Sequence, residues 1–187
     1  MTEGAPLGGV RGGAPERSIM RIAGLVNDSI VDGPGIRFSV FAQGCLHKCP
    51  GCHNPASHDP MGGSEAAVED IISRLAKNPL LDGVTITGGE PFFQAEDCYR
   101  IAKAAQGKGL NVWTYTGYTY EQLAAGRDHH PGWKELLEKT DVLVDGRFLL
   151  EQRSLEIKFR GSRNQRLIDV KKTLAAGEIV LWQEPKW

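Results

Sequence analysis

The sequence predicts an α/β fold, in the form of a partial, open (βα) barrel with mostly parallel strands. Two observations carry this prediction. Segments typical of strands alternate with segments typical of helices, which is the pattern of βαβ units and of a parallel sheet. The chain has 187 residues, too few for a closed eight-stranded barrel of about 250 residues. A partial barrel therefore fits both the alternation and the length.

The composition is that of one soluble domain. Charged residues make up 24% and hydrophobic residues 41%, with a formal net charge of −1, which excludes a uniformly basic nucleic-acid binder. No apolar run approaches the roughly 20 residues that cross a bilayer, and the amino terminus lacks the apolar stretch of a signal peptide. We therefore expect a cytoplasmic protein that binds neither nucleic acid nor membrane. A Gly-rich flexible tail over residues 1–17 precedes a single domain over residues 18–187.

The first predicted elements are an extended segment, a strand and a helix. Arg21–Ile30 forms the extended lead-in, and Ile36–Ala42 is a strand because it is rich in β-branched and aromatic residues. Ser64 is positioned to cap a helix over Glu65–Lys77, whose apolar residues recur at the spacing of one helical face.

The remaining elements continue the alternation. Helices are predicted from apolar residues at helical spacing and strands from short β-branched runs. In chain order they are strand Val84–Thr87, helix Ala95–Gln106, strand Asn111–Tyr115, helix Tyr120–Ala125, helix Trp133–Lys139 and strand Asp141–Val144. Two weaker strand candidates are Ile157–Phe159 and Ile179–Trp182.

Three of the four cysteines follow the first strand in a C-x3-C-x2-C loop, at Cys45, Cys49 and Cys52. Three thiolates on a tight loop can hold three corners of a cubane iron–sulfur cluster and leave the fourth iron open for a ligand. The alternative is a structural zinc site of three cysteines and one histidine, with a fourth ligand from His47, His53 or His58. The fourth cysteine, Cys98, falls on the apolar face of a predicted helix and is interpreted as a core thiol.

Three further motifs each follow a strand. They are Gly88-Gly89-Glu90-Pro91, Thr116-Gly117-Tyr118 and Asp145-Gly146-Arg147. The carboxyl ends of parallel strands lie on the same edge of a sheet, which is where (βα) folds bind ligands. Paired glycines let the backbone approach a ligand closely. We therefore expect the cysteine loop and these three motifs to meet in one site.

Together these motifs resemble the radical S-adenosylmethionine (SAM) superfamily. More closely, the chain resembles the activating proteins of glycyl radical enzymes, and among them the family of anaerobic ribonucleoside-triphosphate reductase activating proteins. The matching stretches occur in the same order in the chain: Asp32–Arg37, Cys45–Asn54, Thr87–Pro91, Trp113–Tyr118, Leu143–Phe148 and Arg160–Gln165. The resemblance implies a partial barrel of the radical SAM type.

The resemblance also implies roles for residues of this sequence. The catalytic residues and metal ligands would be Cys45, Cys49 and Cys52, holding a [4Fe–4S] cluster whose open iron chelates the amino and carboxylate groups of SAM. The cofactor-binding residues would be Gly51, Cys52, His53, Gly88, Gly89, Glu90, Asp145, Gly146 and Arg147.

The reaction implied by the resemblance is the formation of a glycyl radical. One electron from the reduced cluster would cleave SAM to methionine and a 5′-deoxyadenosyl radical, which would take a hydrogen atom from a glycine of the partner. The partner would be the glycyl radical subunit of an anaerobic ribonucleotide reductase, and the electron would come from a low-potential donor such as flavodoxin or ferredoxin. The protein would contribute binding, orientation and exclusion of water.

Two other functions stay open at this point. The same radical chemistry could act on a different peptide or on a small molecule. Alternatively, the chain could be a zinc-stabilised interaction module without enzymatic activity. One departure from the superfamily is the position before the third cysteine, which is often aromatic there and is Gly51 in this chain.

Overall fold

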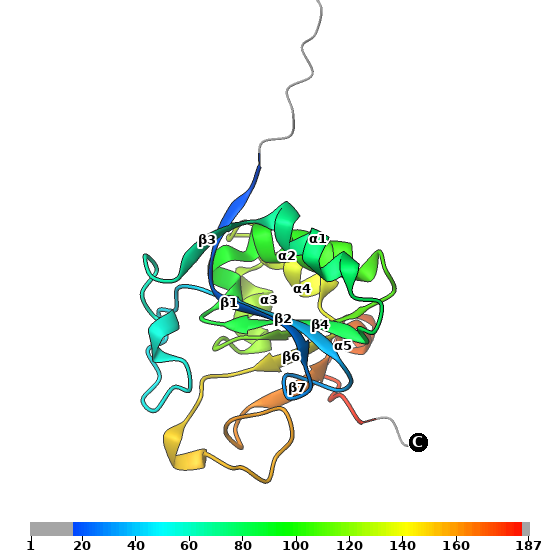
Figure 1. Ribbon diagram of the computed structural model, residues 1–187. Helices are drawn as coiled ribbons and strands as arrows, with labels where there is room; N and C mark the ends of the chain where they lie inside the picture. Colours follow the sequence, from blue (N-terminus) through cyan, green and yellow to red (C-terminus); the bar gives the residue numbers. More distant parts are fainter. Residues whose placement is uncertain (1–16, 185–187) are drawn as a thin grey trace, which may run out of the picture.

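The computed structural model describes residues 17–184 (Figure 1). The predicted tail over residues 1–17 lies outside the described residues except for Arg17. No helix in the described part of the chain is long and apolar enough to cross a membrane.

One sheet of seven strands forms the centre of the molecule, in the order β3-β1-β2-β4-β5-β6-β7. The strands β2, β4, β5 and β6 are parallel, whereas β1, β3 and β7 run antiparallel to their neighbours. Their bounds are β1 Ile19–Ser29, β2 Arg37–Ala42, β3 Ser64–Ala67, β4 Gly83–Gly88, β5 Asn111–Tyr115, β6 Val142–Asp145 and β7 Arg166–Asp169. The sheet is mixed, mostly parallel and open, because β3 and β7 are edge strands.

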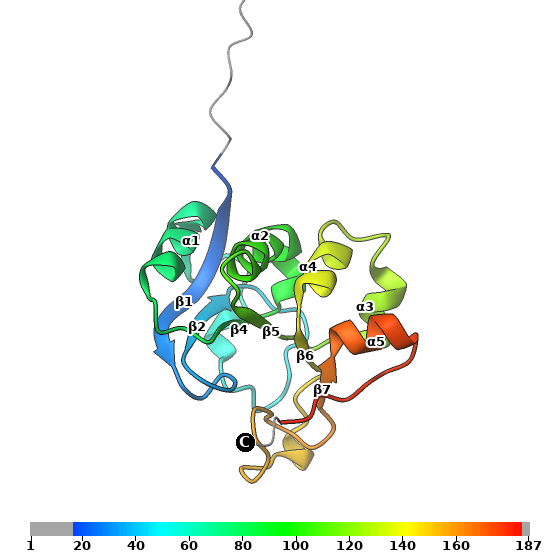
Figure 2. The same cartoon turned by 90° about the vertical axis from the view of Figure 1, so that its right-hand side faces the viewer.

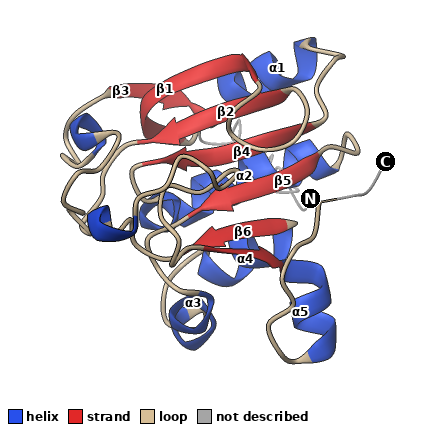
Figure 3. Cartoon of the chain, turned by 90° about the horizontal axis from the view of Figure 1, so that it is seen from below, coloured by secondary structure: helices blue, strands red, loops and turns tan. Residues whose placement is uncertain are grey.

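Helices α1 (Val68–Lys77), α2 (Ala95–Gln106) and α4 (Trp133–Lys139) cover one face of this sheet (Figures 1 and 3). The main apolar core lies between them and the strands. Cys98 of α2 is fully buried in this core, as predicted for a core thiol. The remaining elements are α3 (Tyr120–Gly126), α5 (Val170–Ala176) and short 3₁₀ turns over Pro55–Ser57, Pro91–Gln94 and Leu150–Gln152.

The opposite face of the sheet carries a second, smaller core. It is built on Trp113 of β5, against which the rings of Phe159 and Trp182 pack edge-on at 5.3 and 5.0 Å. The guanidinium of Arg37 lies 5.5 Å from the Trp113 ring and donates to the hydroxyl of Thr85 at 2.6 Å. The segment between β6 and β7 leaves the sheet and folds below it in Figures 1 and 2.

The α/β class and the mostly parallel strands are confirmed, and most predicted elements are present. Helix Ala95–Gln106, strand Asn111–Tyr115 and helix Trp133–Lys139 have the predicted bounds. The extended lead-in is the long strand β1, paired antiparallel with β2.

The prediction of a helix starting at Glu65 with Ser64 as its cap is wrong. The four residues Ser64–Ala67 instead pair with β1, and the helix begins at Val68 without a side-chain cap. The N–H of Val68, which has no partner within its own helix, donates to the carbonyl of Ser18 at 2.9 Å. Pairing with β1 therefore replaces the predicted first turn.

The two weak strand candidates are wrong as strands. Phe159 has a left-handed φ of +59° and lies in a turn, and of Ile179–Trp182 only Leu181 forms an isolated bridge, to Ile168. Strand β7 and helix α5 were not predicted, although Asp169 caps α5 by accepting from the N–H of Lys172 at 3.0 Å. Strand β7 extends the sheet next to β6, and α5 follows it directly in the chain.

Candidate functional site

The carboxyl ends of β2, β4, β5 and β6 meet at one edge of the sheet, as the parallel order predicts. The loops that follow these four strands line one cavity of about 130 Å³. Its walls include the three thiols of the cysteine loop and the backbone of glycines from the other loops: Cys45, Cys49, Cys52, Gly88, Gly89, Gly117 and Gly146. The structure thus brings together motifs that are far apart in the sequence.

The cysteine loop, residues 45–52, is held at this edge by the segment that follows it. The N–H of Gly44 donates to the carbonyl of Ser57 at 2.9 Å, and the N–H of Cys45 donates to that of His58 at 3.1 Å. These bonds fix the start of the loop directly beyond β2.

The thiols of the loop have no disulfide partner. Cys45 is buried, and burial raises the pKa of its thiol, so metal binding there must displace a proton. Cys49 and Cys52 are half-buried. Among residues 17–184, no three His, Cys, Asp or Glu side chains converge as a site for a single metal ion. In a cubane cluster, by contrast, each thiolate binds a different iron.

Two glycines bring the end of β4 into contact with the end of β2 and with Gly44, directly before the cysteine loop. A Cβ at Gly88 would lie 2.7 Å from the backbone nitrogen of Ala42, and Gly88 itself has a φ of +96°. A Cβ at Gly89 would lie 2.5 Å from the carbonyl oxygen of Gly44. The glycine pair is therefore required by the close packing of two backbones, whether or not it also contacts a ligand.

The carboxylate of Glu90 is buried, with 2% of the residue exposed, and is surrounded by donors. It accepts from the N–H of Phe92 at 3.0 Å and from the N–H of Gly117 at 2.9 Å. The hydroxyl of Thr116 lies 2.9 and 3.0 Å from its two oxygens. The fourth partner is Nε2 of His47, at 2.8 Å. Glu90 thus ties the loop after β5 to the cysteine loop.

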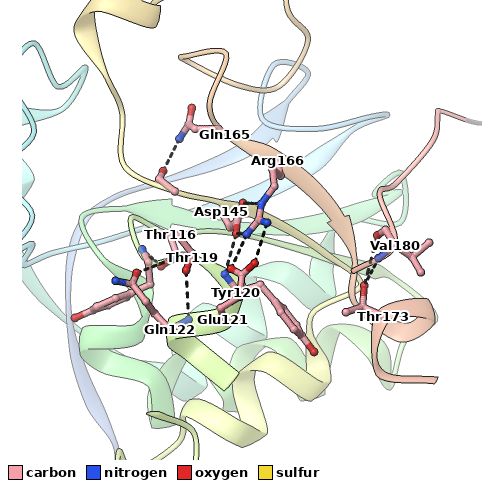
Figure 4. Close-up of polar contacts among 12 residues, drawn as sticks. Thr116, Thr119, Tyr120, Glu121, Gln122, Asp145, Gln165, Arg166, Thr173 and Val180 are labelled. Atoms are coloured by element: carbon pink, nitrogen blue, oxygen red, sulfur yellow. Dashed lines mark hydrogen bonds and ion pairs between the residues drawn. The ribbon is translucent and has the colours of Figure 1, made fainter. Parts of the chain in front are cut away.

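Asp145, at the end of β6, is also buried and is held by a cation (Figure 4). The guanidinium of Arg166 forms hydrogen bonds to both of its oxygens, and the N–H of Tyr120 donates to Oδ2 at 2.8 Å. Arg166 also pairs with the exposed carboxylate of Glu121 at 2.8 and 3.0 Å. These hydrogen bonds lower the pKa of Glu121 to about 2 and raise the pKa of Arg166.

A second cavity of about 500 Å³ adjoins the first and shares Gly117 and Gly146 with it. Asp145, Arg147 and Asn164 are among its lining residues. The side-chain nitrogen of Asn164 donates to the carbonyl of Arg147 at 2.8 Å, which orients the amide and leaves its Oδ1 buried without a partner in the described residues. A buried acceptor of this kind suits a donor from a bound ligand.

Known proteins resemble this chain over most of its length. A family model described as a 4Fe-4S single cluster domain matches residues 31–168. The anaerobic ribonucleoside-triphosphate reductase-activating protein of Escherichia coli (strain K12) is 31% identical over 144 residues, covering 73% of this chain and 90% of the relative. Its counterpart from Enterobacteria phage T4 is 32% identical, with 73% and 86% covered. The pyruvate formate-lyase 1-activating enzyme of Escherichia coli (strain K12) is 36% identical over 173 residues, with 88% and 66% covered.

The chain belongs to the radical SAM activases of glycyl radical enzymes. It is an enzyme, and its cofactors are a [4Fe–4S] cluster and SAM. The family therefore favours an iron–sulfur cluster over a structural zinc site in this chain. That the cysteine loop holds this cluster stays a prediction.

The residues at the sheet edge fit these two cofactors. Three free thiols on one loop are the donor set of a cluster with one open iron. The neighbouring cavity of about 500 Å³ lies in the size range of small-molecule sites and contains the unpartnered oxygen of Asn164. The two spaces adjoin at Gly117 and Gly146, which line both of them.

The predicted SAM-contacting residues are distributed unevenly over this site in the activase. Cys52, Gly88, Gly89 and Gly146 line the smaller cavity, and Asp145, Gly146 and Arg147 line the larger one. Gly51 and His53 are not among the residues that line either cavity: Leu150 lies over Gly51, and the ring of Phe148, which lines the smaller cavity, packs against His53. The carboxylates of Glu90 and Asp145 already have protein partners. Contact of each with SAM stays a prediction.

Several residues of the site were not given roles from the sequence. Phe148 and Gln165 line the smaller cavity, and Arg166 holds Asp145. Thr116 and Gln165 lie within stretches that resemble the family, but only the fold shows which carboxylate or carbonyl each contacts. Arg166 follows the last matching stretch by one residue and had no sequence signal of its own.

Proposed function

We propose that this activase generates the glycyl radical of an anaerobic ribonucleotide reductase. The observation that carries the proposal is coverage: the chain spans 90% of the Escherichia coli reductase-activating protein, but only 66% of the pyruvate formate-lyase enzyme. Cleavage of SAM by one electron from a low-potential donor such as flavodoxin or ferredoxin completes the proposal.

Cys45, Cys49 and Cys52 hold the cluster in this proposal. Their thiols line one cavity, and two backbone hydrogen bonds fix the start of their loop. The open sheet then acts as an incomplete barrel of the radical SAM type, with the site at the carboxyl ends of its parallel strands.

SAM occupies the space beside the cysteine loop in this proposal. The backbone at Gly88 and Gly89 offers acceptors to its amino group, assisted by Glu90, and Gly51 and His53 flank it next to Cys52. Asp145, Gly146 and Arg147 contact its other end in the larger cavity, where Asn164 Oδ1 offers a further acceptor. When bound, the two cofactors supply a one-electron cleavage of SAM that ends with removal of a hydrogen atom from the Cα of the partner's glycine.

The chain's own residues orient the cofactors and exclude water. Glycine backbone forms the close walls of the smaller cavity, and Phe148 closes its side by packing against His53, with ring centroids 5.1 Å apart. The chemistry needs no general acid or base, because only an electron and a hydrogen atom move.

The decisive experiment mixes the reconstituted chain anaerobically with the purified reductase, SAM and a low-potential reductant. We expect an electron paramagnetic resonance (EPR) signal of a glycyl radical, formed only when SAM is present. The matched control is a reductase variant in which the radical-bearing glycine is replaced by alanine. SAM cleavage without any radical on the wild-type reductase would contradict the proposed partner.

A second candidate is activation of a different glycyl radical enzyme, such as a pyruvate formate-lyase. The observation that favours it is the 36% identity over 173 residues to the pyruvate formate-lyase 1-activating enzyme. The same assay with pyruvate formate-lyase in place of the reductase separates the two candidates, because the radical forms on the cognate partner.

A further inference from the structure

In the middle of the cysteine loop, the side chain of His47 is polar and points into the protein. Within Leu46–Pro50, the side chains of Leu46, Lys48 and Pro50 are exposed. The ring of His47 instead points into the protein, where its side chain is 7% exposed. His47 has no part in the proposed binding of SAM.

The partner of His47 is Glu90, from the loop after the next strand of the sheet. Nε2 of the ring lies 2.8 Å from Oε2 of Glu90, whose side chain is 3% exposed. Because the carboxylate is an acceptor, the ring nitrogen that faces it carries the proton and donates. The same carboxylate oxygen accepts from the N–H of Gly117 at 2.9 Å. One buried carboxylate therefore connects three loops, those after β2, β4 and β5.

The loop after β5 is shaped to receive the His47 ring. A Cβ at Gly117 would lie 2.3 Å from Cδ2 of His47, so this position has no room for a side chain while the ring is in place. Tyr118 packs against the ring in an edge-on arrangement, with centroids 4.6 Å apart. The ring is thus enclosed by Glu90, Gly117 and Tyr118.

We propose that His47 is a positioning residue that, through Glu90, fixes Cys49 relative to the SAM site. The inference rests on the proposed function in one respect, that Cys45, Cys49 and Cys52 hold the cluster. Cys49 lies two residues beyond His47. The only residue between them, Lys48, has an exposed side chain. Without the ring as an anchor, Cys49 is held by the loop ends alone. The Cys49 thiol would then no longer keep its place in the cavity that it shares with the backbone of Gly88 and Gly89.

The positioning role proposed for His47 differs from two simpler roles, which are ligation of a metal and packing alone. A metal-ligand role is not supported, because Nε2 is occupied by Glu90 and because no three His, Cys, Asp or Glu side chains converge on one point among residues 17–184. A role in packing alone would depend on the shape of the ring and not on its donor. His47→Gln separates these possibilities, because the amide can donate to Glu90 but has neither the ring's shape nor an imidazole nitrogen.

The first test needs no cofactor and uses the full chain before reconstitution. The rate of alkylation of Cys49 is measured by peptide mass spectrometry in wild type, His47→Leu, His47→Gln and the exposed-site control His129→Ala. We expect Cys49 to react at least about fivefold faster in His47→Leu and within about twofold of wild type in the other two. Equal rates in His47→Leu and wild type would overturn the proposal, as would a His47→Gln rate equal to that of His47→Leu.

The second test measures SAM affinity by calorimetry on the anaerobically reconstituted chains. We expect the affinity to fall at least about tenfold in His47→Leu and to return to within about threefold of wild type in His47→Gln. If His47→Leu does not fold, Gly117→Ala takes its place in the alkylation test, because the added methyl collides with the ring and must raise the alkylation rate of Cys49. An unchanged SAM affinity in His47→Leu, or an unchanged alkylation rate in Gly117→Ala, would overturn the proposal. A wild-type chain that takes up no cluster would instead contradict the proposed function, while the alkylation rates still decide the role of His47.

Discussion

Glu90 follows β4 and Asp145 ends β6, so the two carboxylates lie on either side of the loop after β5. They differ in the kinds of hydrogen-bond donor that surround them. Glu90 is 2% exposed and Asp145 is 1% exposed. Glu90 accepts from the N–H of Gly117 in that loop, and Asp145 accepts from the N–H of Tyr120, the first residue of α3. The other partners of Glu90 are the N–H of Phe92, a hydroxyl and an imidazole, whereas Asp145 is paired with the guanidinium of Arg166.

The site therefore has a buried side at Glu90 and a side at Asp145 that is in contact with solvent through Arg166. The Glu90 side is closed and directed at the cysteine loop through His47, so bulk salt has little access to it. The Asp145 side reaches the surface through Arg166, which is one-third exposed and also pairs with exposed Glu121. We infer that the two sides respond differently to loss of a partner, to salt and to pH.

The largest expected effect is the loss of the iron–sulfur cluster when a cysteine of the cysteine loop is replaced. Cys49→Ala removes one of three thiolates, and we expect iron and sulfide content after anaerobic reconstitution to fall to background. Cys98→Ala is the matched control, because that thiol is buried in the apolar core and burial raises its pKa. Full cluster content in Cys49→Ala would refute the assignment of the loop.

The next largest effect is expected at Arg166. Arg166→Leu leaves the Asp145 carboxylate buried with a single N–H donor, and we expect a loss of about 2 kcal/mol in unfolding free energy. This value is below the range for fully buried pairs because Arg166 is partly exposed. Urea titration measures it. Arg163→Leu, which breaks a pair with exposed Glu156, is the control and should change stability by less than about 0.5 kcal/mol.

A smaller effect is expected on the Glu90 side. Thr116→Val removes one neutral hydroxyl donor from a carboxylate that keeps three others, which costs about 1 kcal/mol. Urea titrations in low salt and in 0.5 M salt (about a 4 Å screening length) should give the same loss. A loss that shrinks with salt would show that this side is not closed to solvent.

The smallest effect is expected for Glu121→Gln at the surface. Arg166 lowers the pKa of Glu121 from 4.5 to about 2. The stabilisation from this depressed pKa is therefore present above pH 4.5 and is lost as the pH falls toward 2. Because Glu121 is exposed, we expect less than about 1 kcal/mol at pH 7, decreasing with salt. The thermal unfolding temperatures of the variant and wild type, measured from about pH 7 down to about pH 2, should converge at low pH, where Glu121 becomes protonated. A constant difference would contradict the assignment.

The sequence predicts the parallel centre of the fold well, because local patterns dominate there. Helix Ala95–Gln106 and strand Asn111–Tyr115 have clear periodicity and Gly-rich ends, and their predicted bounds match the structure. The edges of the sheet were less predictable. The local sequence of Ser64–Ala67 predicts the start of a helix, but these residues adopt an extended conformation because they pair with β1. Strand β7 is short, and its place beside β6 is set by the fold.

In the site, too, local motifs were predictable and long-range contacts were not. Loop motifs after parallel strands were enough to predict that the cysteine loop, Gly88-Gly89 and Gly146 meet at one edge. The partners of the acidic residues were not predictable, because Glu90 and Thr116 are 26 residues apart and Asp145 and Arg166 are 21 apart. Only the packed sheet shows that both carboxylates are occupied by protein donors.

The most direct test of a cluster and SAM site at this edge is the EPR spectrum of the reduced, reconstituted chain before and after addition of SAM. With about four iron and four sulfide per chain, we expect a cluster signal whose shape changes when SAM is added, because SAM binds the open iron. A cluster signal that SAM leaves unchanged would contradict the account, because the cysteine loop and the glycine-lined cavities would then not form one site.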